Sequence, residues 1–459
     1  MDNILYPVSC FSVRRHWSRK LGPTFVHEAN MLSLFGVRAN KNIAVHELMH
    51  FFEHCATPYG AFRDELHKQS LDLVSHFLRE HSGPILTPVY EWAKRYLSDP
   101  TSCPGLDDST AFADLIESAV KPWSRLAHLG ETLEGENVAA VHEATIARVT
   151  LALAEMEATC VLLPQMSPSE EKPCPTMVCE GTDGKAIPIG AILVSECIAQ
   201  IQEGSNKVIG QNIPPQYYAL LLLGMDFHSR TERDFRSRQD RHLEMTLLAL
   251  ADLALFTPIG RTYSRLRPNN ATWQSIHPGW RFFHALELVA KKDWWIASLF
   301  EAENLGNRIC DALEWVRART FLDLGSQIDG PAHARHRMAC EIRLADFMAF
   351  YRRDRIFEPG TPVAEFLSDH MPIVYYPGMG TVFNVPPSDG KNATALRQLR
   401  DCFIALRCRQ VMYERATTNV LPSECRFDLY FENIVHEQDF AMLIAQKYPW
   451  LETSRFHRL

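Results

Sequence analysis

Two histidines separated by three residues carry the clearest chemical signal in this sequence. They stand in the run His46-Glu47-Leu48-Met49-His50. On a helix, side chains four residues apart lie one turn apart on the same face, so both imidazoles can bind one zinc ion. Glu47 then lies beside that face, where its carboxylate can take a proton from a metal-bound water. The pattern therefore predicts a metal site with His46 and His50 as ligands and Glu47 as the catalytic base.

The residues around this motif are apolar, from Ile43-Ala44-Val45 before it to Phe51-Phe52 after it. They predict a helix that is buried on nearly every side except its stripe of His and Glu side chains. Unpaired polar groups are expensive to bury, so such a stripe needs partners. A metal ion would satisfy it. The alternative is a pair of core histidines that are hydrogen-bonded to neighbouring carboxylates.

A catalytic zinc ion usually has three protein ligands and one open position, so a third ligand must come from elsewhere in the chain. Glu196 is the favoured candidate, on an apolar helix over Gly190–Glu203 with the small residue Ala199 one turn later. A helix with HExxH followed by a later helix with Glu-x-x-Ala resembles the pair of motifs found in the gluzincin metallopeptidases. The resemblance implies that Glu196 is the third zinc ligand and that Ala199 lets the two helices approach. It covers Ile43–His54 closely and Gly190–Glu203 loosely, and the long stretch between them demands a helical insertion.

Glu143 is the alternative third ligand, in the segment Val141–Arg148 of an expected apolar helix. Its small residue Ala147 falls four residues later instead of three, whereas Ala144 directly after it resembles the thermolysin-like form of that helix. Glu143 could instead accept a hydrogen bond from a ligating histidine, through the ring nitrogen that does not bind the metal. For either glutamate, the structural alternative is a partly buried acid paired with an arginine such as Arg148.

The same resemblance implies a reaction. Glu47 would act as general base on a zinc-bound water that attacks a peptide carbonyl, while the metal polarises that carbonyl. A donor should then stabilise the oxyanion, and the candidates are Tyr217, Tyr218, His277 and Arg281. The tyrosine pair is also typical of core packing, and the His277 segment of a helix start. This hypothesis calls for a Zn²⁺ cofactor and a peptide or protein substrate.

Apolar spacing of three and four residues dominates the chain and predicts a mainly α-helical fold. The clearest segments are Asn42 to Cys55, Glu65 to Glu80, Asn137 to Leu163, Ala191 to Glu203, His242 to Phe256, Gly279 to Ala290 and Cys340 to Tyr351. The stretch from Thr176 to Ile189 alternates around Asp183-Gly184 and predicts a two-stranded hairpin. We expect a zincin-like helical core with a small β-hairpin or sheet.

The length of 459 residues exceeds what one hydrophobic core usually organises. We expect a zincin-like metal-binding domain with a helical insertion over residues 1–225, and a helical C-terminal domain over residues 226–459. The clearest linker is 164–175, where prolines, serines and acids break the helical spacing. The C-terminal domain would cover the cleft or bind a partner.

The composition excludes several partners. A formal net charge of −8 offers phosphate backbones no overall attraction, so we expect no nucleic-acid partner. No apolar run reaches the roughly 20 residues that cross a bilayer, and the first twenty residues lack the apolar stretch of a signal peptide. The 12 cysteines are spread through periodic segments and read as reduced thiols. We therefore expect a soluble cytoplasmic protein with no membrane partner.

Other chemistries lack their motifs. A di-iron helical bundle needs a second Glu-x-x-His, and the sequence has none. Neither a Gly-x-Ser-x-Gly elbow nor a phosphate-binding Gly-x-x-x-x-Gly-Lys is present. Two alternatives to a metallopeptidase remain. One is a regulatory or binding protein that keeps a zincin-like core without turnover, and the other is a helical interaction scaffold without metal.

Overall fold

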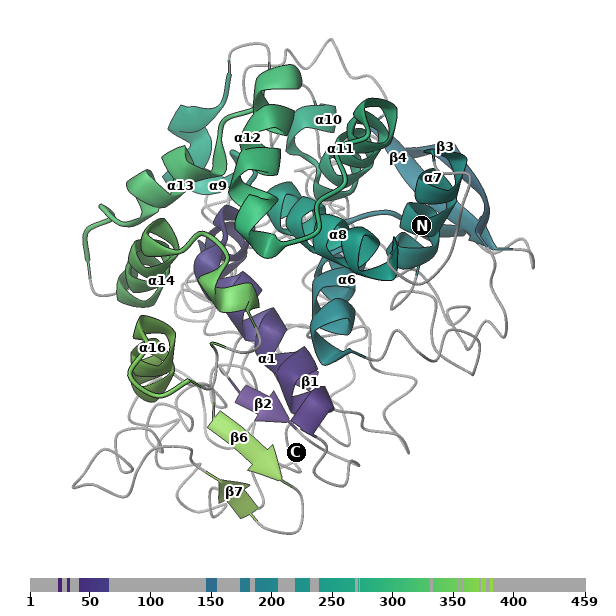
Figure 1. Cartoon of the computed structure of the whole chain (residues 1–459). Coiled ribbons are helices and arrows are strands. Elements are labelled where there is room, and N and C mark those ends of the chain that lie inside the picture. Colours follow the sequence, from purple (N-terminus) through teal and green to yellow (C-terminus); the bar gives the residue numbers. More distant parts are fainter. Residues whose placement is uncertain are drawn as a thin grey trace, which may run out of the picture. The chain divides into compact units, whose positions relative to one another are not determined.

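A computed structural model of the chain describes the HExxH helix and a group of helices around it (Figure 1). The described residues are 24–26, 31–33, 41–65, 146–154, 174–181, 186–204, 219–231, 239–268, 271, 273–330, 333–352, 355, 358–370, 373–376 and 380–382. This part of the chain is mainly helical, as the apolar spacing predicts.

Helix α1 (Lys41–Ala56) carries the HExxH motif and is buried from Val45 to Ala56, apart from the partly exposed His50. Met49, Phe51 and Phe52 are all fully buried. The ring of Phe52 stacks on Phe350 at a centroid distance of 5.1 Å, and Phe51 lies 6.0 Å from Phe366. Burial of each ring contributes roughly 1.5–3 kcal/mol. These apolar contacts determine how α1 is rotated about its axis, and hence where its histidines point.

A tight bend ends α1, and residues 58–65 then form a further helical segment. The Thr57 hydroxyl donates to the carbonyl of Glu53 at 2.6 Å and accepts from the amide of Gly60 at 3.0 Å. A Cβ at position 60 would lie 2.2 Å from the carbonyl oxygen of His54. Only glycine allows the two segments to come this close.

Helix α6 (Ala191–Glu203) packs against α1, and its predicted bounds are confirmed. Ile198 and Ala199 are fully buried. Gly190 precedes the helix in extended backbone, and Gly204 ends it with φ 77°, in the left-handed region that glycine favours. A glycine at each end therefore limits the helix to the segment that the apolar spacing predicts.

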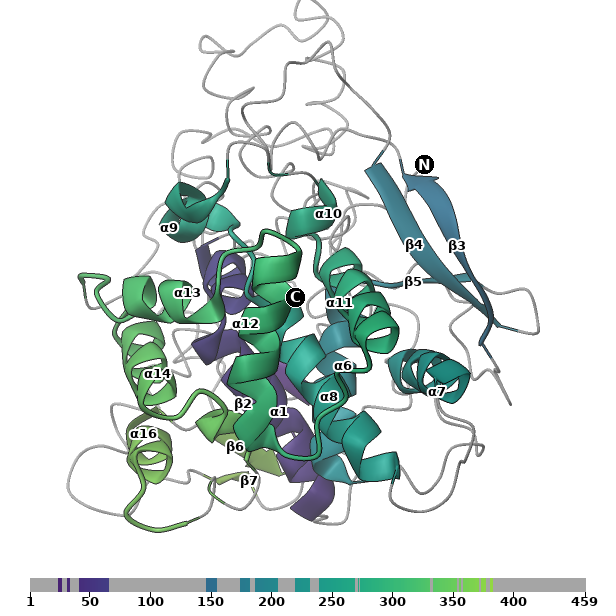
Figure 2. The ribbon, with the colours of Figure 1, turned by 45° about the horizontal axis from the view of Figure 1, so that its top comes forward.

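Helix α8 (Gln239–Leu255) contacts α6, α7, α11 and α12 (Figure 2). The other helices of this region are α7 (Ala219–Thr231), α9 (Gly260–Tyr263), α10 (Trp273–Ile276), α11 (Pro278–Lys292), α12 (Ala302–Ala312), α13 (Ala318–Gly325), α14 (Ala334–Ala345) and α16 (Pro362–His370), with short 3-10 turns η9 (Ser264–Leu266), η10 (Leu299–Glu301) and η12 (Ala349–Tyr351). Among the described residues, no single helix is long and apolar enough to cross a membrane. Arg241–Leu255 and Gly260–Leu266 meet that test of length and composition only when joined across a 91° bend.

The helix predicted from Cys340 to Tyr351 is interrupted in the structure. α14 starts earlier, at Ala334, and ends at Ala345, after which Asp346 takes extended backbone angles. Its carboxylate accepts from the amide of Met348 at 3.3 Å, a local bond that competes with helix continuation. The chain resumes as η12.

Three strands form an antiparallel sheet in the order β3 (Ile146–Ala154), β4 (Cys174–Gly181) and β5 (Ala186–Pro188) (Figure 2). Strand β3 shows that the helix predicted from Asn137 to Leu163 is wrong over these residues. Its Ile146, Val149 and Thr150 are β-branched and favour strands, and pairing with β4 supplies the backbone hydrogen bonds. The linker predicted over residues 164–175 lies outside the described residues except for its last two, which begin β4.

The chain divides into two compact units, and the expected domain boundary after residue 225 is not a border between them. Unit 1 holds the described residues 41–65 and 146–370, so both sides of that boundary belong to it. The reason is packing: α8, after the boundary, lies against α6, before it, so one apolar core continues across it.

Unit 2 contains a separate four-stranded sheet in the order β1 (Thr24–Val26), β2 (Met31–Ser33), β6 (Ile373–Tyr376) and β7 (Gly380–Val382). β2 and β6 pair in parallel, and the other neighbours are antiparallel. Strands that lie far apart in the sequence therefore share one sheet. Residues 383–459 of the expected helical C-terminal domain lie outside the described residues.

Candidate metal centre

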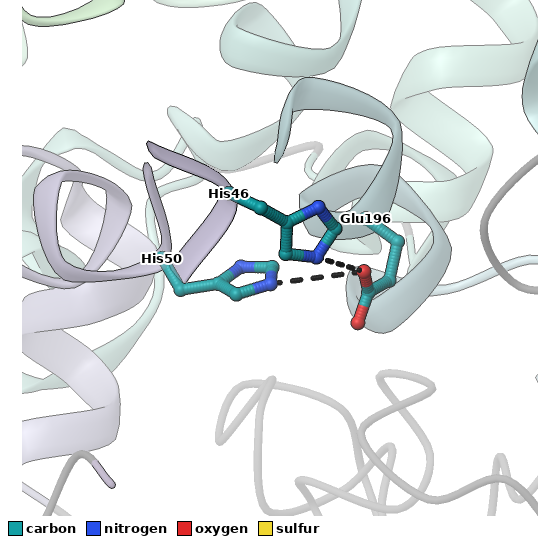
Figure 3. A group of neighbouring side chains, drawn as sticks. All are labelled: His46, His50 and Glu196. Carbon is teal, nitrogen blue, oxygen red and sulfur yellow. Dashed lines mark hydrogen bonds and ion pairs between the residues drawn. The ribbon is translucent and has the colours of Figure 1, made fainter. Parts of the chain in front are cut away.

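Helices α1 and α6 bring together the three residues that the sequence nominates as metal ligands. The Nε2 atom of His46 lies 3.1 Å from Oε2 of Glu196, and Nε2 of His50 lies 3.7 Å from the same oxygen. Figure 3 shows both imidazoles extending from α1 toward this one carboxylate on α6. The two rings are edge to face, with centroids 5.1 Å apart. We call His46, His50 and Glu196 the triad.

The triad has dimensions that suit a small divalent cation. One possible ligand atom from each residue lies within 4.8 Å of the other two. Ligands placed at about 2.0–2.1 Å around a tetrahedral zinc ion are about 3.4 Å apart, so small side-chain movements would complete the site. Two imidazoles and one carboxylate form a known catalytic zinc set that leaves a fourth position open. Among the described residues, no other group of three such side chains has this spacing.

Two further acids lie behind the imidazoles. Oε2 of Glu203, at the end of α6, lies 3.1 Å from Nδ1 of His46. Oε2 of Glu53, one turn along α1, lies 3.3 Å from Nδ1 of His50. When each imidazole is neutral, a proton on Nδ1 can be donated to its acid, and the Nε2 lone pair is then available to a metal ion that Glu196 also binds. We call Glu203 and Glu53 the backing acids.

The charges of this cluster are strongly coupled. Burial alone lowers the pKa of His46, but hydrogen bonds with Glu196 and Glu203 outweigh it and raise that pKa to about 9. The pKa of His50 is also raised, because Glu196 and Glu53 overcome the effect of burial. Burial would raise the pKa of Glu196, yet the two histidines lower it to about 2. Without metal, the triad is therefore an ion-pair network, and a metal ion must displace imidazole protons to bind.

The pKa of Glu53 shifts in the opposite direction to that of Glu196. Burial raises its pKa, although hydrogen bonds with His50 and Ser195 oppose the rise. Its side chain is only 6% exposed. A buried acid in this position favours a shared proton with His50, which suits a residue that orients an imidazole.

The remaining predicted residues fall into two groups. Glu47 follows His46 on α1 and is 6% exposed, so the proposed base belongs to the same buried turn. Glu143, Tyr217 and Tyr218 lie outside the described residues. Glu196 is therefore the acid that lies next to both histidines among the described residues. The position of Glu143 relative to them is not described.

His277 and Arg281, two of the expected oxyanion donors, make structural contacts at the start of α11. Nδ1 of His277 accepts from the amide of Gly279 at 3.1 Å, as an N-cap of that helix. Arg281 donates to the carbonyls of Ser275 and Leu253 at 2.9 and 3.3 Å. None of these contacts involves the triad, so the described geometry gives neither residue the role of oxyanion donor.

Sequence reasoning did not assign the backing acids a role. The signal was present, since Glu53 follows His50 by three residues and Glu203 follows Glu196 by two helical turns. Both spacings place an acid on the face that carries the ligand. Only the packing of α6 on α1 shows that Glu203 reaches His46.

Comparison with family models, with curated proteins and with solved structures finds no match to this chain.

Proposed function

We propose that this protein is a zinc-dependent hydrolase whose metal is held by His46, His50 and Glu196. The observation that carries the proposal is the convergence of the two Nε2 atoms on one oxygen of Glu196, with each Nδ1 facing a backing acid. An imidazole fixed in this tautomer and orientation is the form that binds a metal.

The donor set favours a catalytic site over a structural one. Structural zinc sites are usually closed by four ligands and rich in cysteine, whereas catalytic sites use three protein ligands. Among the described cysteines, Cys197 lies next to Glu196 in sequence, but burial raises its pKa to about 12. Its thiol is therefore protonated at neutral pH and is a poor ligand.

Each residue of the site has a distinct role in the proposed reaction. A bound zinc ion supplies a Lewis acid and a water of lowered pKa. The Glu47 carboxylate accepts the proton of the attacking water and later gives it to the leaving group. Glu203 and Glu53 keep the Nδ1 protons in place and hold the two imidazoles in a fixed orientation. The choice of a peptide bond as substrate, and of a zincin-like fold, comes from the resemblance of the two helices to gluzincins.

The test combines metal analysis with hydrolysis of labelled casein and a mixed peptide library. Wild-type protein should contain close to one zinc ion per chain. Glu47→Gln should retain zinc and lose hydrolysis by about 10²–10⁴-fold, the usual effect of removing a general base. Glu341→Gln, at a 56% exposed position on α14, is the matched control and should change neither. Unchanged hydrolysis in Glu47→Gln would remove Glu47 from the mechanism.

The ion-pair network itself favours one alternative. Both ring nitrogens of His46 already lie 3.1 Å from a carboxylate, so ion pairs can hold the cluster together without a metal. A scaffold of this kind would contain no zinc after dialysis against micromolar zinc. A regulatory protein with a zincin-like core would contain one zinc ion and cleave nothing in the library.

A further inference from the structure

The start of α11 contains a buried arginine that has no carboxylate partner among the described residues. Arg281 is 1% exposed. It donates from Nη1 and Nη2 to two main-chain carbonyls, those of Ser275 and Leu253, while its Nε has no acceptor within the described part of the chain. The face of the guanidinium lies 4.0 Å from the centroid of the Trp315 ring. The side chain is thus held rigidly, and three of its five N–H groups, that on Nε among them, take no part in these two bonds.

The charge on Arg281 is unusual in this fold. Burial lowers its pKa to about 10, so it is still a cation at neutral pH. Arg343 is equally buried, but its guanidinium lies 2.6 Å from the fully buried carboxylate of Asp252. A buried charge without a counterion is costly, and the Arg343 pair shows how the same core normally avoids that cost. Among the described residues, Arg281 has no such acid.

Arg281 lines a cavity of about 260 Å³ in unit 1. The remaining wall is largely apolar, with Pro258, Pro268, Leu313 and Val316. His284 also lines it, and its imidazole is paired with Glu287 at 3.5 Å. This volume is at the small end for ligand pockets, which suits a compact molecule. A cationic side chain in a mainly apolar cavity favours a ligand that has a single negative charge and is otherwise apolar.

We propose that this cavity binds a small organic carboxylate, with its carboxylate paired to Arg281 and its apolar part against the prolines, Leu313 and Val316. The planar guanidinium matches a carboxylate and can bind it through two parallel N–H groups. Glu314, an exposed residue that also lines the cavity, disfavours a dianion such as phosphate. This site is independent of the triad and of the proposed hydrolysis.

The probe is 4-methylpentanoate, with 4-methylpentanamide and inorganic phosphate as comparison ligands. Calorimetric titration of the full chain should give saturable binding of the carboxylate, with at least tenfold weaker binding of the amide and of phosphate. A lost charge-assisted hydrogen bond typically costs about 1.5–3 kcal/mol, which corresponds to roughly tenfold or more in affinity. Equal binding of the amide, or no saturable binding of the carboxylate, would overturn the proposal.

Two variants locate the binding. Arg281→Met should weaken binding of 4-methylpentanoate by tenfold or more, and Arg317→Met is the matched control, because Arg317 is exposed and paired with Asp311. Since Arg281 also supports the ends of α8 and α10, circular dichroism is used to check that its variant folds. Ala271→Phe fills the cavity without removing any bond of Arg281 and should abolish binding. Undiminished binding in Ala271→Phe would place the ligand elsewhere and refute the assignment.

Discussion

Replacement of Glu203 by glutamine tests whether the backing acids prepare the histidines for metal. The change keeps the length and shape of the side chain but replaces the carboxylate that lies 3.1 Å from Nδ1 of His46. Loss of such a partner typically weakens metal affinity by about 10–100-fold, or roughly 1.4–2.7 kcal/mol. Glu53→Gln, behind His50, should have an effect of the same order, although its greater burial adds a folding cost.

The loss of zinc affinity in Glu203→Gln depends on the pH of the assay. In the metal-free protein the pKa of His46 is raised to about 9, partly by its hydrogen bond with Glu203, so protons compete with zinc at pH 7. Glu203→Gln replaces the charged acceptor of that hydrogen bond with a neutral one and so lowers the pKa of His46, which reduces the competition. The full loss is therefore expected only above about pH 9, where His46 is neutral in both proteins.

Zinc affinity can be measured by competition with a chromophoric chelator at pH 7 and at pH 9.5. Glu341→Gln on α14 controls for the charge change, since that side chain is exposed. We expect a larger ratio of wild-type to Glu203→Gln affinity at the higher pH, and no change for the control. Equal affinities of wild type and Glu203→Gln at pH 9.5 would refute the role assigned to the backing acids.

Three further predictions concern stability. Asp252→Asn removes the counterion of the fully buried Arg343, so urea unfolding should show a loss of about 3–5 kcal/mol, and a loss below 1 kcal/mol would contradict this account of the pair. Gly60→Ala places a Cβ 2.2 Å from a main-chain oxygen of α1 and should cost roughly 1–3 kcal/mol in the same assay, whereas a neutral effect would mean that the bend is looser than described. In zinc-free protein, protonated His46 stabilises the fold fully below pH 6.5, because its pKa is raised, and this stabilisation is lost as the pH rises through about 9. Ionised Glu196 stabilises the fold above pH 4.5, because its pKa is lowered, and this stabilisation is lost as the pH falls through about 2. Thermal melts of wild type and His46→Gln should therefore differ most between about pH 4.5 and 6.5, and a difference independent of pH would exclude this ion pair as the cause.

The sequence predicted the elements of the site because their signals are local. Apolar spacing located α1 and α6, and the spacing of His46 and His50 placed both imidazoles on one face. The choice of Glu196 came from a motif resemblance, and the structure brings that residue beside both histidines. The role of Glu203 depends on how α6 lies against α1, which local spacing does not encode.

Other features were not predictable for a similar reason. Strand β3 has apolar residues that fit a helical period as well as a strand, and its pairing with β4 decides between them. Packing between α6 and α8 joins residues on both sides of the expected boundary after residue 225, and local spacing does not encode this contact. Arg281 has no sequence signature of a cavity residue, since its surroundings come from segments on both sides of it in sequence.

The most direct test of the proposed metal centre is a crystal structure of the zinc-loaded protein with anomalous data collected on both sides of the zinc absorption edge. The account predicts one strong zinc peak at about 2.0–2.2 Å from Nε2 of His46, Nε2 of His50 and a carboxylate oxygen of Glu196. A zinc peak bound by other residues, or none while both histidines stay paired with Glu196, would contradict it.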